Sequence, residues 1–136
     1  MAKVYLDSVV VIYLIQGPES LSNAVRGALR AAEGEPPQVA ISDLTRLECR
    51  VLPIREGANA LLGQFDGFFD SQDIEKIVIQ TEAFDLATEL RARHGAKTPD
   101  SLHLAAAILG RCTEFWTNDH RLRAAADGRI GLKIFS

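Results

Sequence analysis

Residues 3–15 read KVYLDSVVVIYLI, and this stretch decides the fold that the sequence predicts. Residues 3–6 form a short apolar run that predicts a strand, and the chain passes straight into an apolar helix predicted at 9–15. The sequence QGP at 16–18 ends that helix. Asp7 is the acidic residue at the point where the strand gives way to the helix.

The alternation of short strands with helices continues to the end of the chain. Four further strands are predicted, at 38–41, 75–79, 114–116 and 132–135. The helices predicted around them lie at 19–32, 43–52, 57–70, 82–94, 98–109 and 119–126. Pro53 is expected to end the helix that begins at Asp43. Alternating strands and helices imply a three-layer α/β/α sandwich with a central, mostly parallel sheet of about five strands.

The bulk composition fits one globular domain over residues 1–136. The chain is 47% hydrophobic and 24% charged, a balance typical of a domain that needs no disulfide. Cys49 and Cys112 lack the spacing of a metal site and are interpreted as buried thiols. The apolar run at 9–15 is too short to cross a bilayer and no export signal is evident, so we expect a cytoplasmic protein without a membrane partner. A net charge of −3 neither indicates nor excludes nucleic-acid binding.

Four acidic residues occupy positions that a parallel sheet would bring to one rim, where function gathers at the carboxyl ends of the strands. Asp7 ends the first strand, and Asp119 closely follows the fourth. Asp100 lies in the first turn of an apolar helix that Thr98 and Pro99 open. Glu48 lies in an apolar stripe of the helix after the second strand, where an uncompensated charge is costly.

Taken singly, each acid also has a structural interpretation. Asp7 is a favoured helix cap, Asp100 and Asp119 can stabilise helix N-termini, and Glu48 can reach solvent or a neighbouring arginine. Taken together, carboxylates that converge repel one another, and a shared divalent cation relieves that repulsion. All-oxygen ligation favours Mg²⁺, with Mn²⁺ as the alternative. Such a site suits phosphodiester hydrolysis, because the metal activates a bound water and neutralises charge on the phosphate.

Four motifs, spread over essentially the whole chain, resemble those of the PIN-domain nucleases, and specifically the VapC toxins of bacterial toxin–antitoxin pairs. They are YLDSVVVIYLI at 5–15, ISDLTRLECRVLPIR at 41–55, TPDSLHLAAAI at 98–108 and FWTNDHRL at 115–122. The resemblance implies a single PIN-like domain whose catalytic, metal-binding acids are Asp7, Glu48, Asp100 and Asp119. It also implies that the hydroxyl groups of Thr117 and Ser8 help to order this site.

The resemblance further implies a function and its partners. The chain would be a Mg²⁺-dependent endoribonuclease that acts as the toxin of a toxin–antitoxin pair and cuts RNA, in this family often a transfer or ribosomal RNA. A co-expressed antitoxin would inhibit it by laying a C-terminal segment across the active-site groove, and the toxin would form a homodimer. Basic residues near the predicted site are candidate contacts for RNA phosphates, and they are Arg46, Arg50, Lys97 and Arg121.

Two other functions stay open. Val9 stands where the family usually has Asn or Ser, so the chain could be a catalytically weak PIN fold that binds RNA or a protein partner. A phosphatase or phospho-acceptor with Asp7 as its nucleophile is the other function, although no D-x-D motif follows the first strand. His103 is interpreted as a packed helix histidine and not as a general base, because the metal already supplies the hydroxide.

Overall fold

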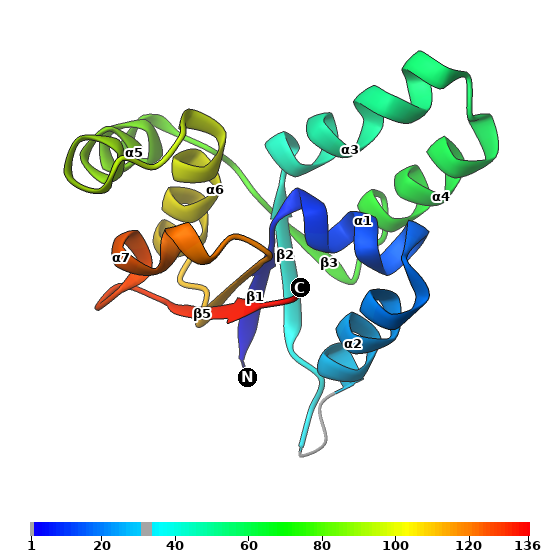
Figure 1. The fold of residues 1–136 in the computed structure, drawn as a ribbon, viewed down its shortest axis with the longest axis horizontal. Coiled ribbons are helices and arrows are strands. Elements are labelled where there is room, and N and C mark those ends of the chain that lie inside the picture. The colour runs from blue at the N-terminus through cyan, green and yellow to red at the C-terminus, as the bar shows by residue number, and fades with distance from the viewer. Residues whose placement is uncertain (1, 31–33) are drawn as a thin grey trace.

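One parallel sheet organises the molecule (Figure 1). The structure, a computed structural model, describes residues 2–30 and 34–136. The five strands are β1 (Lys3–Leu6), β2 (Gln38–Ser42), β3 (Ile74–Ile77), β4 (Glu114–Thr117) and β5 (Gly131–Ile134). They lie in the order β3-β2-β1-β4-β5, and every neighbouring pair is parallel. The predicted parallel sheet is confirmed, and β1 is its central strand.

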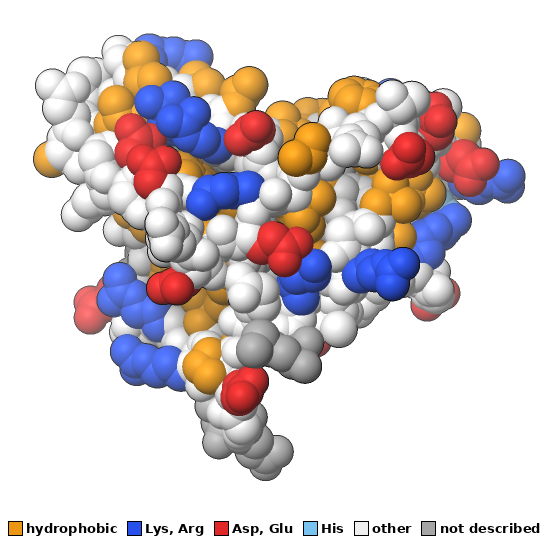
Figure 2. Space-filling model, turned by 180° about the vertical axis from the view of Figure 1, so that it is seen from behind, with side chains coloured by type: hydrophobic (Ala, Val, Ile, Leu, Met, Phe, Trp, Pro, Cys, Tyr) orange, Lys and Arg blue, Asp and Glu red, His pale blue; other side chains and the backbone are white. Residues whose placement is uncertain are grey.

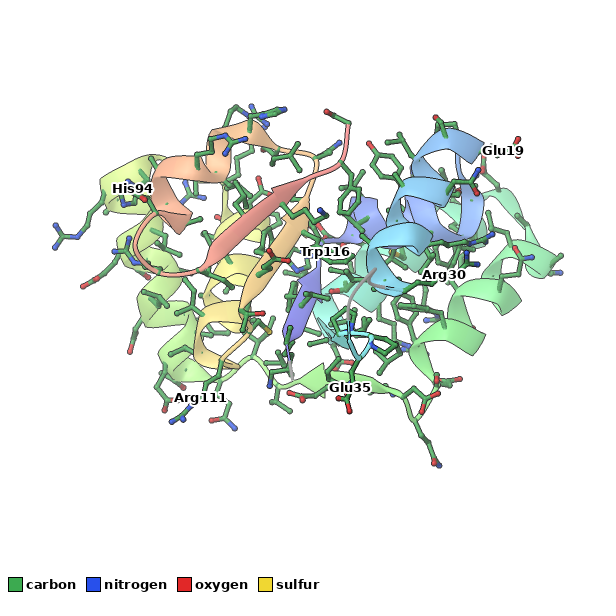
Figure 3. All side chains as sticks on the ribbon, turned by 90° about the horizontal axis from the view of Figure 1, so that it is seen from below. Glu19, Arg30, Glu35, His94, Arg111 and Trp116 are labelled. Atoms are coloured by element: carbon green, nitrogen blue, oxygen red, sulfur yellow. The ribbon has the colours of Figure 1, made fainter. Side chains whose placement is uncertain are left out.

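Helices cover both faces of the sheet. They are α1 (Ser8–Gln16), α2 (Glu19–Arg30), α3 (Asp43–Glu56), α4 (Asn59–Phe69), α5 (Thr81–His94), α6 (Thr98–Leu109), the short 3-10 helix η1 (His120–Leu122) and α7 (Arg123–Ala126). Helices α1–α4 pack on one face and α5–α7 on the other, and the two groups flank the strands in the view of Figure 3. The predicted three-layer α/β/α arrangement is therefore confirmed.

The two faces of the central strands bury different side chains. Leu6 packs into the apolar cluster beneath α1–α4, whereas Tyr5 packs beneath α5–α7. The ring of Tyr5 stacks on Phe115 of β4, with 5.5 Å between ring centroids. Trp116, which is labelled in Figure 3, faces the opposite side and packs against Phe135 at 5.2 Å. The alternation of side chains along each strand thus supplies a core to each face of the sheet.

One predicted helix boundary is wrong. The sequence predicts that Pro53 ends the helix that begins at Asp43, but α3 continues through it to Glu56. A proline inside a helix removes one hydrogen-bond donor and costs about 3 kcal/mol. Pro53 is buried, and the packing of its ring offsets part of that cost. Gly57, with a left-handed φ of 65°, ends the helix instead. The predicted extension of α2 to residue 32 lies outside the described residues.

Both cysteines are free and buried, as the sequence predicts. Burial raises the pKa of the Cys49 thiol to about 12 and that of Cys112 to about 11. Both thiols are therefore protonated at neutral pH, which makes them poor nucleophiles and poor metal ligands. In the part of the chain that the structure describes, no helix combines the length and hydrophobicity needed to cross a membrane.

Gly110, which follows α6, packs closely against β3. A Cβ atom at this position would overlap Cδ1 of Ile77 and lie 2.9 Å from the carbonyl oxygen of Ala106. We expect Gly110→Ala to lower the free energy of unfolding by about 1–3 kcal/mol, measured by urea denaturation. Gly63→Ala in α4 is the matched control, because a Cβ there meets nothing within 4 Å. The control should be neutral or stabilising, since alanine favours helix, and equal losses in both variants would contradict the prediction.

Candidate metal centre

Asp7 is fixed at the carboxyl end of β1 by both its backbone and its side chain. Its N–H donates to the carbonyl oxygen of Trp116 at 2.9 Å, which extends the β1–β4 ladder. Its Oδ1 accepts from the N–H of Ser8 at 2.8 Å and caps α1. Its Oδ2 accepts from the hydroxyl of Thr117 at 2.7 Å. The same buried carboxylate therefore caps the helix and lies in the predicted site.

Glu48 is brought to Asp7 by α3, which begins at the end of β2. Its Oε1 accepts from Ser8 Oγ at 2.6 Å and lies 2.5 Å from Nε2 of His103. Burial acts to raise the pKa of Glu48, but the hydrogen bonds with His103 and Ser8 outweigh it and lower the pKa overall. Glu48 is thus ionised at neutral pH, and these two contacts replace the arginine or solvent that sequence reasoning offered as alternatives.

His103 lies one turn after Asp100 in α6 and has no exposed surface. Its predicted packing in the helix core is confirmed, and the structure adds hydrogen bonds to Tyr5 and Glu48 that the sequence did not predict. Its Nε2 contacts Glu48 and lies 3.8 Å from Oδ1 of Asp7. Asp7, Glu48 and His103 each offer one possible metal-ligand atom, and these atoms all lie within 4.8 Å of one another. The histidine therefore belongs to the acidic site.

Asp100 is half-buried in the first turn of α6, and the other acids affect its ionisation. Burial raises its pKa, and the charges of Asp7, Asp119 and Glu48 raise it further, although His103 acts in the opposite direction. Of the four predicted acids, Asp7 and Glu48 therefore share a close cluster with His103, and Asp100 and Asp119 lie outside that cluster but near enough for the acids to affect one another's charge.

Asp119 has a cationic partner that sequence reasoning did not foresee. Its Oδ1 accepts from the backbone N–H of Arg121 at 2.9 Å, and the guanidinium group of Arg121 contacts both of its carboxylate oxygens, at 2.9 and 3.0 Å. The side-chain hydrogen bond with Arg121 lowers the pKa of Asp119. Arg121 therefore neutralises part of the charge of this acid.

The four basic residues predicted to contact phosphates have different environments. Arg121 binds Asp119, and Arg50 donates to Asp66 at 2.8 Å. Lys97 is the exposed N-cap residue of α6, and its charge also acts to lower the pKa of Asp119. Arg46 lines a groove along α3. Among the four, Lys97 and Arg121 therefore act electrostatically on a site acid.

A buried polar network behind the acids escaped sequence reasoning. The hydroxyl of Tyr5 lies 2.7 Å from Ser42 Oγ, 3.3 Å from Thr45 Oγ1 and 2.7 Å from Nδ1 of His103. The one signal in the sequence is that Tyr5 stands two residues before Asp7, which places both on the same side of β1. Val9 packs against the apolar cluster beneath α1–α4, while the hydroxyl of the neighbouring Ser8 reaches Glu48.

These residues fit a hard divalent cation. The candidate ligands are carboxylate oxygens of Asp7, Glu48, Asp100 and Asp119, the ligand type that Mg²⁺ and Mn²⁺ prefer. Burial and the charges of neighbouring acids raise the pKa of Asp100, so ionised Asp100 is disfavoured without a further positive charge. A bound cation would supply that compensation.

The family model for the PIN domain matches residues 4–128, a range that contains all four acids. The chain belongs to the PIN domain family. PIN domains are generally nucleases, so membership supports a nuclease function for this PIN domain. A comparison with the sequences of curated proteins found no match.

Solved structures similar to this PIN domain include three from toxin–antitoxin complexes. A toxin–antitoxin complex from Klebsiella pneumoniae has 24% identity and a TM-score of 0.66, with 98% of each chain covered. VapBC2 from Rickettsia felis, bound to a DNA fragment from its promoter, has 17% identity and a TM-score of 0.73, covering 98% of this chain and 99% of that one. VapBC-5 from Mycobacterium tuberculosis has 23% identity and a TM-score of 0.60, covering 99% and 98%. At these identities the similarity shows the shared fold.

In the metal-free protein, we expect Asp100→Asn to raise the free energy of unfolding at pH 7. A carboxyl group whose pKa is raised by folding opposes folding once it ionises, so stability falls as pH rises from the ordinary value of about 3.9 through the raised one. The expected gain at pH 7 is about 0.5–1 kcal/mol, because solvent screens a half-exposed group. Thermal unfolding in a chelator from pH 4 to 7 measures it.

The gain from Asp100→Asn should shrink toward acidic pH, where the wild-type carboxyl group is also neutral. Asp85→Asn, at an exposed position of α5, is the control and should leave the melting temperature unchanged at every pH. A lower melting temperature for Asp100→Asn at pH 7 would show that its charge is stabilised, and not destabilised, in the fold.

Proposed function

We propose that this PIN domain is a Mg²⁺-dependent endoribonuclease, with Mn²⁺ as an alternative ion, and that it is the toxin of a toxin–antitoxin pair in the bacterial cytoplasm. The observation that carries the proposal is the cluster of Asp7, Glu48 and His103, whose possible ligand atoms lie within 4.8 Å of one another. Asp7, Glu48 and Asp119 also act electrostatically on Asp100, at the start of α6. Membership of a family whose domains are generally nucleases supports a nuclease activity for this acidic site.

The residues of the chain prepare the site for the cation. Thr117 and the N–H of Ser8 each hold one oxygen of Asp7, so this carboxylate has a fixed orientation. Ser8 Oγ and His103 hold Glu48. A bound Mg²⁺ supplies an activated water and neutralises charge on the scissile phosphate.

RNA as the substrate is supported by the motifs and by the arrangement of charge around the site. Helices α1, α3 and α6 begin close together between the α3–α4 lobe and the α5–α6 lobe (Figure 1). The surface dips between these lobes, and lysine and arginine side chains lie on both of them (Figure 2). Lys97 and Arg121 stand at the rim, where cations can hold phosphates of a bound strand.

An exposed apolar stripe on α3 supports a protein partner. Leu47, Val51 and Ile54 are 59%, 43% and 55% exposed. With Arg46 and Arg55 they line a groove of about 590 Å³. Exposed apolar surface rimmed by charge is typical of protein interfaces. We assign the groove to an antitoxin that carries apolar and acidic residues, and the proposed homodimer is tested separately by the oligomeric state.

Asp7→Asn tests the proposed catalytic site. Asparagine keeps an oxygen to cap α1 but removes the negative charge, so RNA cleavage should fall by about 100-fold or more while the fold persists. Cleavage of total RNA in Mg²⁺ and far-UV circular dichroism measure the two properties. Asp85→Asn on α5 is the control and should cleave like the wild type. Full activity in Asp7→Asn would refute the assignment of the site.

Ile54→Asp tests the proposed partner groove. The new carboxylate should repel an acidic segment and weaken binding to the product of the neighbouring reading frame by about tenfold or more, measured by calorimetry. RNA cleavage by the free toxin should not change, because Ile54 is exposed on α3 and lies more than one helical turn beyond Glu48. Glu56→Asp, an exposed conservative change at the end of α3, is the control. Unchanged affinity in Ile54→Asp would place the antitoxin elsewhere.

Val9 motivates the second candidate function, a catalytically weak PIN fold that binds RNA or a partner. An apolar residue at this position contributes no hydrogen bond to the acids, and Val9 packs into the core instead. Titration with Mg²⁺ separates the two functions. Binding in the millimolar range or tighter favours the nuclease, and no binding favours the interaction module.

A further inference from the structure

A chain of buried hydrogen bonds joins Tyr5 to the carboxylate of Glu48. The hydroxyl of Tyr5 lies 2.7 Å from Nδ1 of His103, and Nε2 of the same ring lies 2.5 Å from Oε1 of Glu48. Tyr5 and His103 are both 0% exposed. The ring of Tyr5 is stacked on Phe115, and its centroid lies 5.6 Å from that of His103 in an edge-on contact. Packing therefore fixes both rings.

The contact with Glu48 determines where one proton lies. An ionised carboxylate only accepts hydrogen bonds, so the proton between His103 and Glu48 belongs to Nε2. The other ring nitrogen, Nδ1, faces the hydroxyl of Tyr5 at 2.7 Å, and a hydroxyl group can both donate and accept. The same hydroxyl lies 2.7 Å from Ser42 Oγ, where either oxygen can be the donor. Every polar group along the chain therefore has a partner.

The same assignment separates His103 from the candidate ligands. A ring nitrogen that donates a hydrogen bond to Glu48 has no lone pair with which to bind a cation. Nε2 is therefore not a metal ligand, although its distances from the acids would suit one. Both hydrogen bonds to Glu48, from His103 and Ser8, go to Oε1. Among the described residues none donates to Oε2, so that oxygen is the one available to a metal.

We propose that Tyr5 and His103 are positioning residues for Glu48. Tyr5 holds the ring of His103 through the contact with Nδ1, and His103 fixes the orientation of the Glu48 carboxylate toward the cation. The inference rests on the proposed metal-dependent function and adds two residues to it. Hydrogen bonds to ligating carboxylates commonly change metal affinity by about 10–100-fold, so the loss of this chain should be measurable.

Tyr5→Phe removes the hydroxyl group and keeps the ring that stacks on Phe115. In the metal-free wild type, ¹⁵N NMR should show a proton on Nε2 of His103, whereas in Tyr5→Phe the Nδ1 signal should shift because its hydrogen-bond partner is gone. The dissociation constant for Mn²⁺, measured by electron paramagnetic resonance, should rise by about tenfold. Tyr13→Phe is the matched control, because Tyr13 is the other tyrosine of the chain and its hydroxyl accepts from Asn118 at 3.1 Å.

Substitution of His103 tests the second link and serves if Tyr5→Phe does not fold. Glutamine can still donate an N–H to Glu48, whereas leucine cannot. We expect His103→Gln to bind Mn²⁺ at least about fivefold more tightly than His103→Leu, with the same far-UV circular dichroism spectrum. Equal affinities in the two variants would overturn the positioning role.

The outcomes distinguish this inference from the proposed function. Absence of Mn²⁺ binding by the wild type would refute the metal-dependent function, and the inference with it. Normal binding and RNA cleavage by the wild type, with unchanged Mn²⁺ affinity in Tyr5→Phe, would overturn the positioning role alone. A wild-type His103 without a proton on Nε2 would also overturn it, because Nε2 would then have a lone pair free to bind the metal.

Discussion

Repulsion among carboxylates at one rim of a parallel sheet is the constraint on which the rest of this site depends. The protein compensates each acid in a different way. Asp7 receives a hydroxyl group and a helix N-terminus, Glu48 receives an imidazole and a hydroxyl group, and Asp119 receives a guanidinium group. For Asp100, burial and the charges of the other three acids raise the pKa, so its ionised form is disfavoured in the metal-free protein. The metal-free protein is thus less stable at this site than it would be with a cation bound.

Much of the architecture follows from local patterns in the sequence. Short apolar runs separated by amphipathic or apolar helices predict the sheet, and the parallel order places residues such as Asp7 and Asp119 at one edge. Pro53 shows where local rules fail, because the helix propensity of a residue does not include the packing that it gains in the folded chain. Its burial against neighbouring elements is a tertiary property that no window of sequence contains.

The predicted acids are recognisable from residues close to them in the sequence, whereas the missed residues are recognisable only from contacts with residues far along the chain. An acid at the end of a strand or the start of a helix is recognisable from its immediate neighbours. The contact of Tyr5 with His103 joins residues 98 positions apart, and its detection requires the spatial register of β1 against α6. The pair of Asp119 and Arg121 spans two residues and was open to local reasoning, since a helix-capping acid has its partners in the following turn.

The hydrogen bond between Asp7 and Thr117 spans 110 positions of the chain. The central strand β1 is synthesised before both of its neighbours, and β4 is the later of the two. The acidic site therefore cannot be completed on a growing chain until Thr117 has left the ribosome. Long-range pairing of this kind slows folding, and it also means that chains ending before Thr117 lack the assembled acidic site.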